Sequence, residues 1–104
     1  MERFAFKMYL NKGQKEEYKK RHDEIWPDLK NLLKKAGISE YSIFLDEDTN
    51  TLFAFQKVSE KDGSQNLGQN EIVQKWWDYM ADIMKVNPDN SPVSKELVEL
   101  FYLE

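Results

Sequence analysis

One stretch organises this chain: residues 16–27, which read Glu16-Glu-Tyr-Lys-Lys-Arg-His-Asp-Glu-Ile-Trp-Pro27. Residues four apart lie above one another on an α-helix, so Tyr18, His22 and Trp26 are expected to share one face. His22 is the only histidine in 104 residues, and histidine is the side chain that titrates near neutral pH. The spacing therefore predicts one titratable group on an aromatic, apolar helix face.

Pro27 is expected to interrupt this helix, because proline lacks an N–H and its ring clashes with the preceding turn. A helix over about residues 14–36 should kink near residues 23–26, with Asp23 as a candidate N-cap of its second half. Such a kink beside His22 would splay two half-helices and open a pocket. The same pattern also fits a purely structural role, in which a half-buried histidine lies on a helix that packs against a sheet.

The rest of the chain alternates strand and helix signals around this helix. Apolar and polar residues alternate with the period of a strand at residues 3–10, 40–46 and 51–58, with a hairpin loop at 46–50. An apolar stripe predicts a helix at residues 71–85, and residues 97–103 are expected to form the last strand. The order β-α-β-β-α-β predicts an α+β, ferredoxin-like fold, an antiparallel sheet with two helices on one face.

Two of the predicted strands are apolar on both faces, which requires cover on both sides of the sheet. Tyr41, Ile43 and Leu45 share one face while Phe44 lies on the other. In the next strand, apolar residues likewise fall on both faces: Leu52, Ala54 and Val58 on one, Phe53 and Phe55 on the other. Since the helices cover only one face, the uncovered face is larger than a soluble monomer usually exposes. We therefore expect a homodimer formed through that face.

Length and composition limit the function classes. With 104 residues the chain is expected to be a single domain, residues 1–104. The formal net charge of -4 argues against a nucleic-acid surface. There is no cysteine, which suits the cytoplasm, and no apolar run approaches the roughly 18 residues of a membrane-spanning helix. The N-terminus also lacks a signal-peptide pattern.

Most catalytic motifs are absent, which leaves a single general acid or base in an aromatic setting. The sequence has no phosphate-binding glycine loop, no thiolate and no Gly-x-Ser-x-Gly elbow. A lone histidine cannot build a histidine-rich metal site, and no carboxylates have ligand spacing beside it. We therefore expect no metal and no cofactor, with His22 as the candidate catalytic residue.

Trp76-Trp77 is the second informative motif, because adjacent tryptophans cannot both point into the core from one helix. One interpretation is a core tryptophan beside one at an interface. The other is an indole wall for a sugar, since flat aromatic faces pack against the C–H faces of a sugar ring and the N–H groups can reach hydroxyls. Tyr18 and Tyr41 would add hydroxyl partners to such a site, although Tyr41 alone also fits an ordinary sheet residue.

Five motifs of the chain are specific when taken together: Glu16-Glu-Tyr-x-x-Arg-His22, Ile25-Trp-Pro27, Trp76-Trp77, Asn87-Pro-Asp-Asn-Ser-Pro-Val-Ser94 and Phe101-Tyr-Leu103. On these motifs the chain resembles the L-rhamnose mutarotase family along essentially its full length. The resemblance implies a small cytoplasmic homodimer of the dimeric α/β-barrel type, without a cofactor, that interconverts the α and β anomers of L-rhamnose. Residues 59–70 depart from the family pattern, which is more helical there and carries an aromatic residue.

Carried over position by position, the resemblance makes His22 the proton donor and assigns sugar contacts to Tyr18, Tyr41, Trp76 and Trp77. Two alternatives remain at this point. Some dimeric α/β-barrel proteins degrade haem with an axial histidine on a helix and a nearby tryptophan, which His22 with Trp26 or Trp76 would mimic. The other alternative is a sugar-binding module in which His22 only donates or accepts a hydrogen bond.

Overall fold

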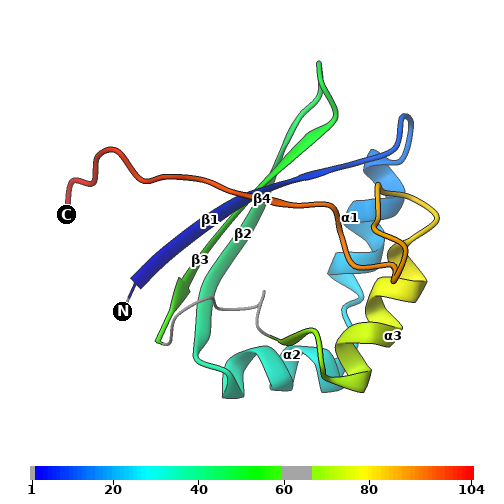
Figure 1. Cartoon of the computed structure of the whole chain (residues 1–104), viewed down its shortest axis with the longest axis horizontal. Helices are drawn as coiled ribbons and strands as arrows, with labels where there is room; N and C mark the ends of the chain where they lie inside the picture. Colours follow the sequence, from blue (N-terminus) through cyan, green and yellow to red (C-terminus); the bar gives the residue numbers. More distant parts are fainter. Residues whose placement is uncertain (1, 60–66) are drawn as a thin grey trace.

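The computed structural model describes residues 2–59 and 67–104, and it has the predicted α+β, ferredoxin-like architecture. A four-stranded antiparallel sheet, in the order β2-β3-β1-β4, carries its helices on one side (Figure 1). Along the chain the elements are β1 (Glu2–Tyr9), α1 (Lys15–Asp23), α2 (Pro27–Lys35), β2 (Ile38–Asp46), β3 (Thr51–Val58), α3 (Glu71–Met80) and β4 (Lys95–Glu96). No helix within the described ranges is long and apolar enough to cross a membrane.

The interruption predicted at Pro27 divides the first helical region into α1 and α2. Trp26 is the N-cap of α2 with an extended backbone, φ −59° and ψ 132°, because the residue before a proline is disfavoured in the helical region. Pro27 occupies the first helical turn, where a backbone N–H would have no partner within the helix, so the missing N–H of proline costs no hydrogen bond. The prediction of Asp23 as the N-cap was wrong: Asp23 is the last residue of α1 and pairs with Lys19 at 2.7 Å.

The second helical region ends earlier than its apolar stripe predicts. Helix α3 ends at Met80, although Ile83 and Met84 are both buried. The backbone beyond the helix bonds to the chain that follows β1 instead: the Asn11 N–H donates to Ile83 O at 2.9 Å, and the Lys85 N–H donates to Tyr9 O at 2.9 Å. The stripe therefore predicted burial correctly, while these long-range bonds replace the last helical turn.

The strand predicted at residues 97–103 was wrong, since β4 contains only Lys95 and Glu96, opposite Lys7 and Phe6. The last described backbone hydrogen bond of this segment runs from the Leu97 N–H to Ala5 O. A strand requires a ladder of such bonds. The segment instead extends away from the helices to the C-terminus (Figure 1), and its apolar side chains are exposed, with Leu100 at 92 %.

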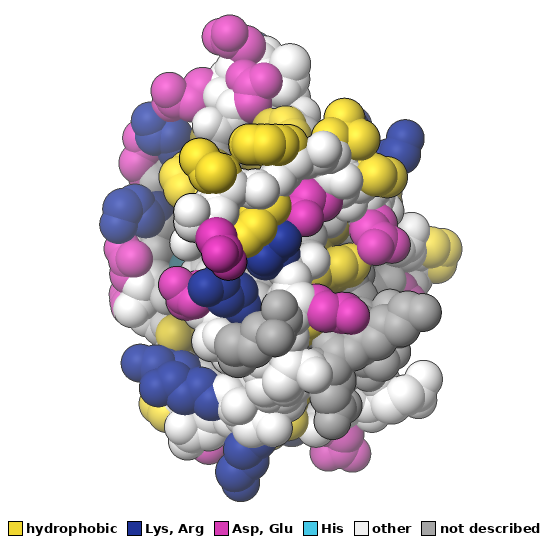
Figure 2. Space-filling view, turned by 90° about the vertical axis from the view of Figure 1, so that its left-hand side faces the viewer, with side chains coloured by type: hydrophobic (Ala, Val, Ile, Leu, Met, Phe, Trp, Pro, Cys, Tyr) yellow, Lys and Arg dark blue, Asp and Glu magenta, His cyan; other side chains and the backbone are white. Residues whose placement is uncertain are grey.

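The two faces of the sheet differ as predicted. Leu52 and Ala54 are buried beneath the helices, whereas Phe53 and Phe55 lie exposed on the opposite face at 37 % and 39 %. Figure 2 views the side of the molecule opposite the helices, where hydrophobic side chains emerge among charged ones. The core therefore lies between the sheet and the helices, and one face of the sheet has no cover within the described chain. The departure expected at residues 59–70 falls largely on residues 60–66, outside the described ranges.

Candidate functional site

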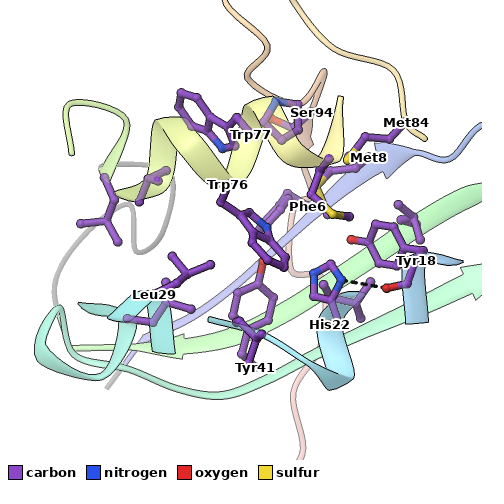
Figure 3. Close-up of a pocket in the computed structure, with 18 of the residues that line it drawn as sticks. Phe6, Met8, Tyr18, His22, Leu29, Tyr41, Trp76, Trp77, Met84 and Ser94 are labelled. Atoms are coloured by element: carbon purple, nitrogen blue, oxygen red, sulfur yellow. Dashed lines mark hydrogen bonds between the residues drawn. The ribbon is translucent and has the colours of Figure 1, made fainter. Parts of the chain in front are cut away.

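A cavity of ≈ 1120 Å³ lies between the helices and the covered face of the sheet (Figure 3). Residues from α1, α2, β2 and α3 line it, together with the loop that follows α3. Its inner wall is mainly apolar and includes Phe6, Met8 and Met84. All five predicted site residues line this cavity: His22, Tyr18, Tyr41, Trp76 and Trp77.

His22 projects from α1 into this cavity, and its neighbours fix its ring. The His22 and Tyr18 rings stack with centroids 4.3 Å apart and planes 24° apart, as the spacing of four residues predicts. The Trp76 ring meets His22 edge-on, with centroids 5.4 Å apart at 89°. The imidazole is therefore held between one helix turn and the facing helix, in the aromatic setting expected from the sequence.

One ring nitrogen of His22 has a partner whose chemistry defines the tautomer. Nδ1 lies 3.1 Å from the main-chain oxygen of Tyr18, and a carbonyl can only accept a hydrogen bond. Nδ1 must therefore carry the proton, which leaves Nε2 of the neutral ring as the basic atom. Burial lowers the pKa of His22, while the bond to Tyr18 and the charge of Asp23 oppose this shift. The neutral imidazole is consequently favoured at neutral pH.

Tyr18 lies beneath the imidazole and is nearly buried, with 8 % of its surface exposed. Burial, with a smaller contribution from Tyr41, raises the pKa of its hydroxyl far above the ordinary value of tyrosine. The hydroxyl therefore stays protonated at any physiological pH. It is suited to donate a hydrogen bond and unsuited to act as a base.

The two adjacent tryptophans diverge from α3 (Figure 3). Trp76 is 9 % exposed and points toward His22 and Tyr41, while Trp77 points away from them, toward the segment that precedes α3. Gly68 permits the close packing of Trp77, because a Cβ at that position would lie 3.0 Å from the indole ring. Trp76 is thus both a core residue and a wall beside His22, and Trp77 forms a separate part of the cavity wall.

Tyr41 joins this cluster from the sheet. It lies on the covered face of β2 with Ile43 and Leu45 and is partly buried. Figure 3 shows its hydroxyl directed toward Trp76. Strand β2 and helix α3 therefore bring hydroxyl and indole groups to the side of the cavity opposite α1.

Trp26 departs from the position that helical spacing assigned to it. The helix ends before Trp26, so its ring leaves the His22 face and packs behind Trp76, with centroids 5.1 Å apart at 88°, and against Tyr79 at 5.6 Å. Trp26 does not line the cavity. It supports the Trp76 wall from behind.

Sequence reasoning missed the contribution of the loop after α3 to the cavity. Asn87, Asp89, Ser91 and Ser94 line one part of the wall. The loop is ordered by its own bonds: the Asn87 N–H donates to Ser91 O at 2.8 Å, and the Ser91 N–H donates to the Asp89 carboxylate at 3.0 Å. The available signal was a polar segment with two prolines, Asn87-Pro-Asp-Asn-Ser-Pro92, but nothing in it shows which cavity it borders.

The residues at the site can transfer one proton and hold a small polar molecule between aromatic walls. Among residues 2–59 and 67–104, no group of three or more histidine, aspartate or glutamate side chains is placed to hold a metal ion. The positions of His22 Nε2 and the two tyrosine hydroxyls instead provide one base and two hydrogen-bond donors.

Comparison with known proteins identifies close relatives of this chain. A family model for L-rhamnose mutarotase matches residues 3–103. An L-rhamnose mutarotase from Formosa agariphila is 73 % identical over 104 residues, and one from Bacteroides thetaiotaomicron is 64 % identical over 104 residues, in both cases covering 100 % of each chain. The crystal structure of L-rhamnose mutarotase FA22100 from Formosa agariphila superposes with a TM-score of 0.93, at 69 % identity and 100 % coverage of both chains.

A more distant structure supports the fold alone. The crystal structure of a dimeric ferredoxin-like protein from an uncultured marine organism is 18 % identical to this chain. It covers 97 % of this chain and 96 % of its own, with a TM-score of 0.57. The ferredoxin-like assignment made from the order of the elements is therefore confirmed.

Proposed function

Because the chain belongs to the L-rhamnose mutarotase family, we propose that it interconverts the α and β anomers of L-rhamnose, with His22 as the group that transfers the proton. The observation that carries the catalytic assignment is the bond between His22 Nδ1 and the Tyr18 carbonyl at 3.1 Å. It holds the imidazole in the tautomer whose Nε2 is free to accept a proton.

Interconversion of the anomers requires mainly a group that can accept and donate a proton. To open the pyranose, the C1–O5 bond breaks, the anomeric hydroxyl O1 loses its proton, and O5 gains one. The open-chain aldehyde then rotates about the C1–C2 bond, and the same two proton transfers run in reverse as the ring closes on the other carbonyl face. A positioned acid or base accelerates this kind of step by roughly 10²–10⁴-fold.

His22 is suited to the O1 side of this cycle. Since burial favours its neutral form, Nε2 takes the proton from O1 as the ring opens. The imidazolium formed in this way is the proton donor when the ring closes. Tyr18, whose hydroxyl remains protonated, is suited to donate a hydrogen bond to the ring oxygen as negative charge develops there. Solvent water supplies the proton that O5 gains, and takes it back as the ring closes.

The remaining site residues suit the sugar. Trp76 offers an indole face against the C–H groups of the pyranose, while Trp77 and the Tyr41 hydroxyl provide further wall and hydrogen-bonding groups. L-Rhamnose is a 6-deoxy sugar, and its methyl group requires an apolar contact. The inner wall of the cavity supplies such contacts through Phe6, Met8 and Met84.

Exchange between the anomers of L-rhamnose, followed by NMR magnetisation transfer, tests this function. We expect the protein to raise the exchange rate in proportion to its concentration. A protein that binds rhamnose without changing the rate would instead be a sugar-binding module. The haem-degrading alternative has no observation in its favour, whereas the family match covers residues 3–103.

We also propose that the protein works in the cytoplasm, in rhamnose metabolism, as a homodimer formed through the uncovered face of the sheet. Phe44, Phe53 and Phe55 expose 67 %, 37 % and 39 % of their surfaces on that side. The apolar C-terminal segment, residues 97–103, extends on the same side of the molecule and exposes Leu100 and Phe101. A second copy of the chain would bury both surfaces together.

A further inference from the structure

Arg21 precedes the catalytic histidine and makes a set of contacts that the proposed reaction does not use. Its Nε donates to the Glu17 carboxylate at 2.8 Å within α1. Its Nη1 and Nη2 reach across to Asp82 at 2.8 Å and 3.2 Å, and Nη1 also donates to the main-chain oxygen of Tyr79 at 2.7 Å. Its guanidinium lies 4.5 Å from the centroid of the Tyr79 ring. Only 11 % of the Arg21 side chain is exposed.

Helix α1 has few other means of attachment to the rest of the protein. Seven of the nine residues from Lys15 to Asp23 are charged, and Tyr18 is the only buried one. A helix of this length is not stable alone in water, so tertiary contacts must hold it. Besides Tyr18 and the exposed pair of Lys15 with Glu47, Arg21 attaches α1 to the rest of the protein. Its contacts reach Tyr79 of α3 and Asp82 just beyond that helix.

The same two helices carry the site. His22 belongs to α1 and Trp76 to α3, and their rings meet at 5.4 Å. Tyr79, which Arg21 contacts through both its carbonyl and its ring, packs on Trp76 and on Trp26 with centroid distances of 5.6 Å in each case. A change in the Arg21 contacts would therefore shift α1 against the wall that faces His22.

We propose that Arg21 is a positioning residue for the proton transfer: its contacts with Asp82 and Tyr79 set the placement of His22 relative to Trp76 and thus to the bound sugar. This inference rests on the proposed function of His22. Arginine fits the role because its planar fork holds a carboxylate with two parallel bonds, which lysine cannot do. A displacement of about 1 Å at a reacting group can lower the rate by roughly 10²-fold.

A role confined to stability is the competing explanation, and the geometry argues against it. Asp82 is 67 % exposed, so water screens much of the attraction between the two charges, and such pairs stabilise folded proteins only slightly. The contacts of Arg21 instead fix how α1 is oriented, because four described hydrogen bonds converge on one guanidinium that is itself shielded from solvent.

Arg21→Lys tests the proposal, with Arg3→Lys as the matched control. Arg3 also holds a carboxylate with two bonds, to Glu99 at 2.8 Å and 2.9 Å, and lies over an aromatic ring, that of Tyr102, but it does not line the cavity. We expect Arg21→Lys to lower the maximal anomer-exchange rate at least about tenfold while KM changes less than about threefold. The sugar contacts of Tyr41, Trp76 and Trp77 lie on other elements. Arg3→Lys should change neither value.

The second readout is the NMR spectrum of the single histidine, which reports geometry without any sugar. The ring protons of His22 lie near the edge-on indole of Trp76, so their chemical shifts carry its ring-current contribution. Arg21→Lys should move these shifts toward those of a free histidine, and Arg3→Lys should leave them unchanged. If Arg21→Lys does not fold, Asp82→Asn, which keeps the Tyr79 and Glu17 contacts of Arg21, should produce smaller changes of the same kind.

A folded Arg21→Lys protein with the wild-type rate and wild-type His22 shifts would overturn the proposal. So would equal changes in the Arg3→Lys control, because they would indicate a general loss of order. If the wild-type protein does not exchange the anomers, the proposed function fails, yet the His22 shifts still decide whether Arg21 positions the imidazole.

Discussion

The two faces of the sheet are built from the same strands but differ in how far their side chains are buried. In β3, Leu52 and Ala54 are 2 % and 1 % exposed, while their neighbours Phe53 and Phe55 are 37 % and 39 % exposed. The covered face holds His22 and Tyr18 among apolar and aromatic walls, and burial lowers the pKa of His22 and raises that of Tyr18. The uncovered face presents exposed aromatic side chains, among them Phe53 and Phe55. We therefore expect proton transfer on the covered face and association of two chains on the uncovered one.

The largest expected effect is on the covered face, at His22. His22→Asn should fold and bind rhamnose, because Tyr18, Tyr41 and the tryptophans still form the cavity. The anomer-exchange rate per folded molecule should fall by roughly 10²–10⁴-fold, since the titrating nitrogen is gone, whereas affinity should change by about one hydrogen bond, roughly 0.5–1.5 kcal/mol. Magnetisation transfer between the anomers measures the rate. Wild-type exchange by the folded variant would remove His22 from the mechanism.

Trp76 tests whether one side chain on this face can belong to both core and site. Trp76→Ala should lower the free energy of unfolding by roughly 3–5 kcal/mol and weaken rhamnose binding. Trp77→Ala should weaken binding with a smaller loss of stability, because Trp77 is only partly buried. Replacement by Phe should preserve part of the packing in both cases. Urea titration and sugar titration separate the two quantities, and unchanged binding in both folded alanine variants would exclude an indole contribution.

Phe53 tests the uncovered face. Phe53→Ser should weaken association of two chains, because burying such a side chain contributes roughly 1.5–3 kcal/mol and a two-fold interface contains it twice. The monomer should keep its fold, since the side chain is already exposed there. Sedimentation at micromolar concentration measures the effect. A wild-type protein that remains a monomer under these conditions would contradict the proposed interface itself.

The smallest expected effect is the pH dependence that His22 adds to stability. Its pKa is lowered in the folded state, so below about pH 6.5 the unfolded chain binds more protons than the folded one. Stability should therefore fall as the pH drops from about 6.5 through the folded pKa, by less than about 1.4 kcal/mol per pH unit. Urea midpoints at fixed protein concentration should show this slope in the wild type and a reduced one in His22→Asn. An equal slope in both would assign it to other groups.

Local signals in the sequence predicted most of the fold because their physical causes are local. Pro27 disrupts a helix wherever it occurs, and alternating side chains define the faces of β2 and β3 without reference to other segments. Two errors arose where a distant segment decided the outcome. The backbone at Ile83 and Lys85 bonds to residues 9–11, and residues 97–103 have the composition of a strand but no ladder of bonds within the described chain.

The sequence likewise predicted the site contacts made within one helix but not those that depend on distant segments. Tyr18 and His22 meet because they lie one turn apart on a continuous helix, so their spacing was sufficient. Trp26 follows the helix end, so the same spacing rule misplaced it. Arg21 resembles the other charges of a solvated helix until the fold brings Asp82 to it from 61 positions away. Partners of this kind leave no periodic signal in a single sequence.

The hydrogen bond from His22 Nδ1 to the Tyr18 carbonyl has a consequence for which substitutions this protein can accept. In many enzymes a carboxylate side chain fixes the histidine tautomer, and one point mutation removes it. Here the acceptor is a main-chain oxygen, which every amino acid at position 18 would supply. Drift at that position could alter how the sugar is held, but the protonated nitrogen would remain the same one for as long as the helix turn forms.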